Sequence, residues 1–352
     1  WAFDLAPAVS TITDSLFEAS IRALNMTSLE FIRATLVDAG LAAFTSPPIH
    51  APSDLERLRW PHLALPVIHG GGPSVVRPAS LRCCVAFTHV SQPAKMSEVG
   101  AGVPPVGWVP ASWKALRQMP LEMAKLLQSE KGLGSLVVEG VPHCHPEGLA
   151  HSMRLARKAG EVVANQVGQP GGTSGVLLAA ADEAWVESAG VYEFDTGKPL
   201  SLQQLVELYA EMSEDGWLRT IVQPFRLLDA ATGCELLRAN RPELHLAMDC
   251  VTASPGEGGA CGCFLRLGGT VPSALRQVVE QIPRWRGVGG FGRCLLLDGS
   301  VAPVLPQTVL IALALQEADT ICFAPHVDDE DILRMGMQVD EVMQRATFAG
   351  LT

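Results

Sequence analysis

The sequence has few charged residues, and basic residues are the scarcer kind. Only 18% of its 352 residues are Asp, Glu, Lys or Arg, and 26 basic residues against 37 acidic ones give a formal net charge of −11. Because contact with phosphate backbones requires a basic face, this balance excludes a general nucleic-acid binder. The hydrophobic content of 48% can fill a sizeable core, which excludes global disorder.

Long apolar runs are missing as well. None approaches the ~18 residues that a membrane-spanning helix needs, and the longest notable run near the C-terminus is Val309 to Leu315. We therefore expect no transmembrane segment. The first fifteen residues include Asp4 and Asp14 but no Lys or Arg, so they do not form a signal or transit peptide. The chain begins at Trp1 rather than Met, either because a targeting segment has been removed or because the chain is trimmed.

Cysteine is too sparse for a disulfide scaffold. The nine cysteines are irregularly spaced, Cys83 and Cys84 are adjacent, and the Cys261-Gly262-Cys263 segment is too tight for an ordinary bridge. We therefore expect reduced thiols in a soluble, reducing compartment. The missing Met favours a processed protein of the mitochondrial matrix, with a ciliary or flagellar structure and the cytoplasm as alternatives.

The hydrophobic pattern divides the chain into two regions. Residues 1–60 are predicted to be a helical N-terminal segment, in which Thr13-Asp14 precedes one amphipathic run and Ser28 caps a second. Over residues 61–352, short apolar runs alternate with amphipathic helices. Alternation of this spacing favours a parallel sheet, and so many units favour a closed β/α barrel. The expected strands are 63–68, 81–90, 136–138, 176–181, 220–222, 244–248, 263–267, 294–297 and 320–323, and the expected helices are 113–128, 149–163, 201–212, 272–282, 306–317 and 328–345.

Two local motifs are better explained as loops. The segment Gly287 to Gly292 matches G-x-G-x-x-G, but it follows a predicted helix and precedes a strand, the reverse of the dinucleotide-binding order. The tripeptide His143-Cys144-His145 carries zinc-binding side chains without a second group at metal-ligand spacing. Neither motif specifies a function.

Several short segments, taken in their order along the chain, resemble enolase. Leu65 to Gly72 is similar to the family's stretch ending in Asn-Gly-Gly, Val176 to Trp185 to its strand ending in Ala-Ala-Ser-Glu-Phe, and Thr220 to Phe225 to its Ser-Ile-Glu-Asp-Pro-Phe strand. The likeness runs from about residue 61 to 345. It implies an α/β fold with an enolase-type β/α barrel, preceded by a short helical remnant of the family's N-terminal capping domain.

The resemblance also implies a set of pocket residues. Enolase interconverts 2-phosphoglycerate and phosphoenolpyruvate, and its family uses one or two Mg²⁺ ions to stabilise an enediolate and a Lys base to remove the carbon-bound proton. Glu139 and Glu183 correspond to carboxylates on the acid side of that reaction, and Asp249 corresponds to a metal ligand. Together with Arg266, they would form a remnant pocket at the carboxyl ends of the strands.

The family's other metal-binding positions carry residues of a different chemistry. They correspond to Leu178, Val222 and Cys250. Mg²⁺ is a hard cation that takes oxygen ligands, which aliphatic side chains and a thiol do not supply. We therefore expect Mg²⁺ binding to be lost, and we expect no other metal or cofactor.

The catalytic base and the phosphate-binding loop of the family are replaced too. The base Lys corresponds to Arg266, whose guanidinium stays protonated and cannot accept a proton. The Ser-His-Arg-Ser loop corresponds to the segment that contains Leu297, and a second active-site Lys corresponds to Cys322. No catalytic residue is therefore expected.

These departures predict a non-catalytic, enolase-like pseudoenzyme that serves as a structural or interaction subunit of a larger assembly of proteins. Two alternatives remain: a divergent enolase-superfamily enzyme, and a small-anion-binding module that uses the remnant pocket through Arg266. The family's dimer contacts include its N-terminal domain, which is shortened here. We therefore do not expect a family-type homodimer.

Overall fold

The computed structural model describes the chain in separate stretches. They are residues 2–46, 48, 61–70, 81–88, 111–129, 137–138, 141–142, 148–194, 198–249, 262–267, 270–286, 295–298, 305–315 and 318–322.

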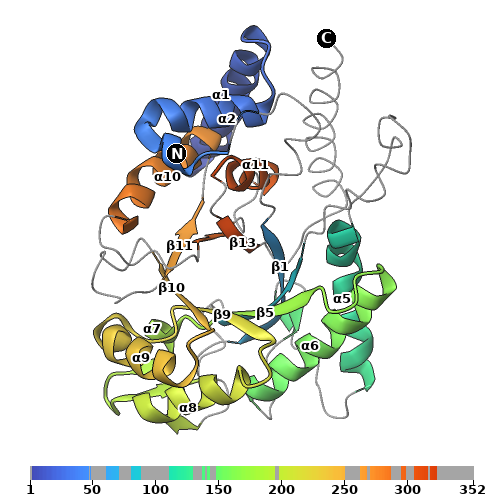
Figure 1. The fold of residues 1–352 in the computed structure, drawn as a ribbon, viewed down its shortest axis with the longest axis vertical. Coiled ribbons are helices and arrows are strands. Elements are labelled where there is room, and N and C mark those ends of the chain that lie inside the picture. Colours follow the sequence, from blue (N-terminus) through green and yellow to red (C-terminus); the bar gives the residue numbers. More distant parts are fainter. Residues whose placement is uncertain are drawn as a thin grey trace.

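Eight strands form a closed barrel at the centre of the molecule (Figure 1). Their order around the ring is β1-β13-β12-β11-β10-β9-β5-β2, and β2 pairs with β1 to close it. The strands are β1 (His62–Gly70), β2 (Leu81–Phe87), β5 (Thr173–Leu178), β9 (Leu218–Val222), β10 (His245–Asp249), β11 (Gly262–Arg266), β12 (Leu295–Asp298) and β13 (Ala318–Cys322).

The strand directions correct the predicted fold. β2 runs antiparallel to both of its neighbours, β1 and β5, whereas the other neighbouring pairs run parallel. The sheet is therefore mixed and curled, and the expectation of an enolase-type β/α barrel made of repeated parallel strand–helix units is wrong. β2 pairs directly with the strand that precedes it, with Gly70 opposite Leu81 and Leu63 opposite Phe87. Antiparallel neighbours of this kind need no helical crossover between them.

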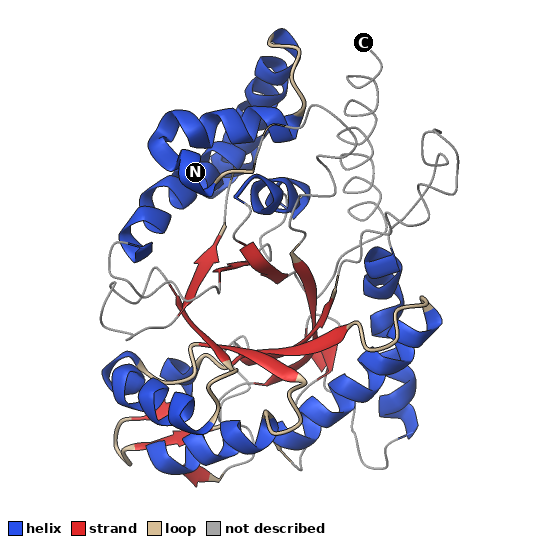
Figure 2. Cartoon of the chain, viewed as in Figure 1, coloured by secondary structure: helices blue, strands red, loops and turns tan. Residues whose placement is uncertain are grey.

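Helices surround the barrel, as Figure 2 shows for the blue helices around the red strands. α6 lies against β2 and β5, and it approaches them closely because Gly160 has no side chain. A Cβ at that position would lie 2.7 Å from Val85 Cγ1. The surrounding helices are α5 (Ala111–Ser129), α6 (Leu149–Gln166), α8 (Leu202–Met212), α9 (Leu227–Asn240), α10 (Val271–Arg286) and α11 (Leu305–Leu315).

The described N-terminal residues, 2–46, are mostly helical, with starting points that differ from those predicted. α1 (Ala2–Ala23) begins well before Thr13, and α2 (Ser28–Leu36) is capped by Thr27 rather than by Ser28. The Thr27 hydroxyl accepts the Glu30 N–H at 3.1 Å while the Glu30 carboxylate accepts the Thr27 N–H at 2.6 Å. This reciprocal pair satisfies two backbone donors that the helix itself leaves unpaired.

The N-terminal helices are attached to the barrel's outer layer. α2 packs against α11, and α1 contacts α10. The chain then passes through a wider π-helical turn, η1 (Val37–Leu41), and a tighter 3-10 turn, η2 (Ala42–Phe44). After these turns, the Ser46 N–H donates to the Ala314 carbonyl of α11 at 2.7 Å. Backbone hydrogen bonding and apolar packing therefore both hold this region to the barrel.

Five short strands and one helical turn complete the described structure. β3 (Val137–Val138) and β4 (Val141–Pro142) form an antiparallel pair. After β5 come the turn α7 (Ala181–Ala184) and a three-stranded sheet of β6 (Trp185–Val186), β7 (Val191–Glu193) and β8 (Pro199–Leu200).

The buried apolar side chains form two clusters. Successive side chains of a strand point to opposite faces, so in β2 Cys83 and Val85 pack outward toward the helices while Cys84 and Ala86 fill the barrel interior. The same alternation runs around the ring. The inner cluster consists of Ala64, Cys84, Ala86, Val176, Leu178, Val222, Ala247, Phe264 and Cys322.

One cysteine departs from the expected redox state. Cys263 of β11 is disulfide-bonded, so the expectation of uniformly reduced thiols is wrong. Spacing along the chain does not show which cysteines approach one another in the fold, so the cysteine pattern could not exclude a bridge. Within the described stretches, no helix combines the length and the apolar character needed to cross a bilayer.

Candidate functional site

The carboxyl ends of the parallel strands lie at one end of the barrel, which we call the mouth. Leu178 ends β5, Val222 ends β9 and Cys322 ends β13, and all three are buried members of the inner cluster. Hydrocarbon side chains have no lone pairs, and a thiolate is a soft ligand. These three side chains therefore offer nothing that would hold Mg²⁺.

Asp249 and Arg266 end the neighbouring strands β10 and β11, where they form an ion pair. Arg266 Nε donates to Asp249 Oδ2 at 2.8 Å. The two residues follow the inward alternation set by Ala247 and Phe264 of the inner cluster. The Asp249 side chain is only 2% exposed and that of Arg266 is 55% exposed, so the guanidinium lies on the solvent side of a buried carboxylate. A carboxylate at this depth is costly to bury without such a partner.

The other predicted site residues are not brought into this pair. Glu183 lies exposed on α7, the turn that follows β5. Leu297 belongs to β12, where its backbone is in register with Leu265 and Ile321, and its side chain is outside the described structure. Glu139 and Cys250 lie outside the described residues.

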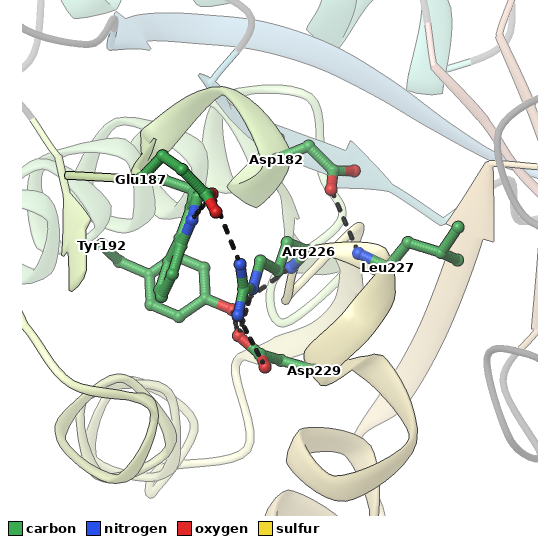
Figure 3. Close-up of polar contacts among 7 residues, drawn as sticks. Asp182, Glu187, Tyr192, Arg226, Leu227 and Asp229 are labelled. Carbon is green, nitrogen blue, oxygen red and sulfur yellow. Dashed lines mark hydrogen bonds and ion pairs between the residues drawn. The ribbon is translucent and has the colours of Figure 1, made fainter. Parts of the chain in front are cut away.

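Asp182, next to Glu183 on α7, links the end of β5 to the start of α9. Its Oδ1 accepts the N–H of Leu227, the first residue of α9, at 3.1 Å (Figure 3). Burial raises the pKa of Asp182, and the charges of Glu183 and Asp249 raise it further, while the Leu227 N–H and the Arg226 charge oppose the shift. A carboxylate at this position complements the partial positive charge of a helix N-terminus.

Arg226, just before α9, is held on several sides by residues of the small three-stranded sheet and of α9. Its Cζ lies 3.6 Å from the centroid of the Trp185 ring, and its Nε donates to Asp229 Oδ2 at 2.7 Å. A second nitrogen lies 3.7 Å from the Glu187 carboxylate. The Tyr192 hydroxyl donates to the same Asp229 oxygen at 2.6 Å (Figure 3). The cluster thereby fastens β6 and β7 to the N-terminus of α9.

The protonation states of this cluster follow from its contacts. Burial alone would raise the pKa of Asp229, but hydrogen bonds from Arg226 and Tyr192 and the Arg226 charge outweigh it, and the pKa is lowered overall. Burial, followed by donation to Asp229, raises the pKa of Tyr192 far above its ordinary value. At neutral pH the Asp229 carboxylate is therefore ionised and accepts, and the Tyr192 phenol is protonated and donates. These protonation states suit a structural role for the pair.

Two strand ends at the mouth carry unusual backbone geometry. Ala180 has φ 48° and Gln223 has φ 49°, in the left-handed region that residues other than glycine seldom enter. The Ala181 N–H donates to the Gln223 carbonyl at 3.1 Å, so the two turns support each other. Each such residue costs of order 1 kcal/mol, and strain of this kind is concentrated at functional sites.

Sequence reasoning did not find the Arg226 cluster. Trp185 lies far from Arg226 along the chain, and no local pattern indicates that the Arg226 guanidinium stacks on the Trp185 ring. The spacing of Arg226 and Asp229 was the one available signal, because residues three apart at a helix start can form an ion pair.

The described stretches contain no group of three or more His, Cys, Asp or Glu placed to hold a metal ion. Neither the protein-family models nor the curated proteins compared with this chain match it. The described strand ends at the mouth include one buried carboxylate, Asp249, with the Arg266 guanidinium on it, and the buried ends Leu178, Val222 and Cys322.

Proposed function

We propose that this chain is a non-catalytic protein that serves as a structural or interaction subunit of a larger assembly. The observation that carries the proposal is the Asp249–Arg266 ion pair at the mouth. The pair occupies the buried carboxylate of Asp249 on β10. Arg266, its partner, cannot accept a proton.

Three other strand ends at the mouth support the same reading. Proton abstraction beside a carboxylate needs a base, together with a cation or donors to stabilise the enediolate. Leu178, Val222 and Cys322 supply neither a hard-metal ligand nor a positive charge. The relationship to enolase remains a prediction from the sequence alone. We propose that the chain is a relative of enolase that has lost the reaction.

The interaction part of the proposal is supported by an apolar stripe on α1. Ile12 and Leu16 are 61% and 64% exposed, and with the exposed Ala19 and Ala23 they follow spacings of four, three and four residues along one side of the helix. We call these four residues the α1 stripe. The opposite side of α1 is already buried through Phe17 and Ile21. A helix that is apolar on a second, exposed side is typical of an interaction surface.

The experiment that tests the proposal is a dehydration assay with 2-phosphoglycerate and saturating Mg²⁺. We expect no turnover above background from the wild-type chain and none from Arg266→Lys, which returns a potential base to β11 but restores no metal ligand. An active enolase assayed in parallel shows that the conditions support the reaction. Turnover by the wild-type chain would overturn the proposal.

A further inference from the structure

Arg82 lies at the mouth, on the inner face of the barrel. It is the second residue of β2, and because β2 runs antiparallel to β5, its start lies beside the end of β5, with Arg82 opposite Leu178. Directly opposed residues of an antiparallel pair share a face. Leu178 belongs to the inner cluster, and Arg82 is in phase with Cys84 and Ala86, which belong to it too.

The Arg82 side chain is half-buried, and its Nε is a buried donor without a hydrogen-bond partner. Among the buried side-chain atoms of the described residues, it is the only guanidinium nitrogen in that condition. Two acidic side chains at this end of the barrel have other partners: Asp249 is paired with Arg266, and Asp182 accepts the Leu227 N–H. An unsatisfied buried donor on a charged group is costly, and native structures normally satisfy it with an ion, a water or a ligand.

We propose that Arg82 is the recognition residue of a binding site for a small oxyanion, a phosphate or a carboxylate group, inside the barrel mouth. The planar guanidinium presents donors that match the oxygens of either group. Arg266 lies across the ring, four strands from Arg82 in either direction, and its side chain is 55% exposed. A second positive charge thereby faces the same opening. Binding at this site needs no chemistry at the mouth, so it goes beyond the proposed function and is independent of the dehydration assay.

The test is isothermal titration calorimetry of the full chain with inorganic phosphate and, separately, with malonate, both at an ionic strength matched with sodium chloride. The wild-type chain is expected to bind at least one of them saturably, and the anion that binds more tightly identifies the group recognised. Arg82→Gln is expected to weaken that binding at least about tenfold, because a charge-assisted hydrogen bond from a desolvated donor to the anion is lost.

Arg219→Gln is the matched control. Arg219 is an exposed arginine of β9 whose neighbours Leu218 and Thr220 are buried, and its removal should change the affinity less than about twofold. Arg82→Lys keeps the charge but not the planar fork, and it should bind more weakly than wild type while remaining folded by circular dichroism. The absence of saturable binding of either anion to the wild-type chain would overturn the proposal. Equal affinities of the wild-type, Arg82→Gln and Arg219→Gln chains would overturn it too.

Discussion

Arg226 shows how single side chains hold the loops at the mouth. Its guanidinium stacks on Trp185 and binds Asp229, and Asp229 in turn accepts from Tyr192. Asp229 and Arg226 are each about one-fifth exposed, whereas the Glu187 side chain is 87% exposed. The partly buried contacts should therefore contribute more to stability than the exposed ion pair with Glu187.

The substitution Asp229→Asn tests this ranking. It should lower the free energy of unfolding by about 1–2 kcal/mol at pH 7, because the charge-assisted hydrogen bonds from Arg226 and Tyr192 are weakened. Glu187→Gln should change it by less than about 0.5 kcal/mol. Urea denaturation followed by circular dichroism measures both, and a larger effect at Glu187 than at Asp229 would contradict the ranking.

The contribution of Asp229 to the free energy of unfolding depends on pH. The pKa of Asp229 is lowered in the folded state, so its contribution is fully present above the unfolded-state pKa of about 3.9 and is lost as the pH falls through the folded-state value. The stability difference between wild type and Asp229→Asn should accordingly be constant near neutrality and shrink below about pH 4. A difference that grows on acidification would show that the pKa is not lowered.

At the scale of elements, α9 sits close to the turn that follows β9. Gly233 of α9 faces Phe225, and a Cβ at Gly233 would lie 2.6 Å from the nearest ring carbon. Phe225 is fully buried and contacts Tyr209, whose hydroxyl donates to the Pro224 carbonyl at 3.1 Å. The ring has little room to move, so this glycine sets the distance between helix and turn.

Gly233→Ala should therefore destabilise the protein by about 1–3 kcal/mol, although alanine is the better helix former. Thr232→Ala, at the exposed neighbouring position of the same helix, is the control and should be neutral or slightly stabilising. Both are measured by urea denaturation. A Gly233→Ala variant as stable as wild type would mean that Phe225 can shift, and the geometry around Arg226 would then be adjustable.

At the scale of the whole molecule, the barrel is surrounded by helices and α1 lies outside that layer, packed on α10 and α2 (Figure 1). The α1 stripe belongs to this outer helix, whereas the proposed oxyanion site lies on the inner face of the barrel. The proposed assembly contact and the proposed oxyanion site therefore involve different residues and can be examined separately.

The double substitution Ile12→Ser and Leu16→Ser tests the α1 stripe. Both side chains are exposed, so the midpoint of thermal unfolding should stay close to that of wild type. Incorporation into high-mass assemblies, measured by size-exclusion fractionation of extracts from cells of the native source, should fall about tenfold or more because the apolar anchor is lost. Leu121→Ser, at a similarly exposed leucine of α5, should incorporate like wild type. Equal incorporation of all three chains would show that the stripe is not the contact.

The sequence by itself predicted many of the helices and strands, although α9 (Leu227–Asn240) was not among them. The predicted helix 201–212 is confirmed as α8, where Ser201 caps the helix by accepting from Gln204, and the predicted strand 220–222 is confirmed within β9. These elements follow from hydrophobic periodicity and capping residues, which act between residues close together in the chain.

Only the tertiary structure decided which elements lie side by side and in which direction each strand runs. Strand direction depends on the pairing partner, so the reversal of β2 and the place of Arg82 at the mouth could not be read from the apolar pattern of residues 81–90. The Asp249–Arg266 pair and the stacking of Arg226 on Trp185 likewise join residues that approach only after the ring of strands has closed. A local pattern fixes the face on which a side chain lies, and the closed sheet fixes which other side chains it meets there.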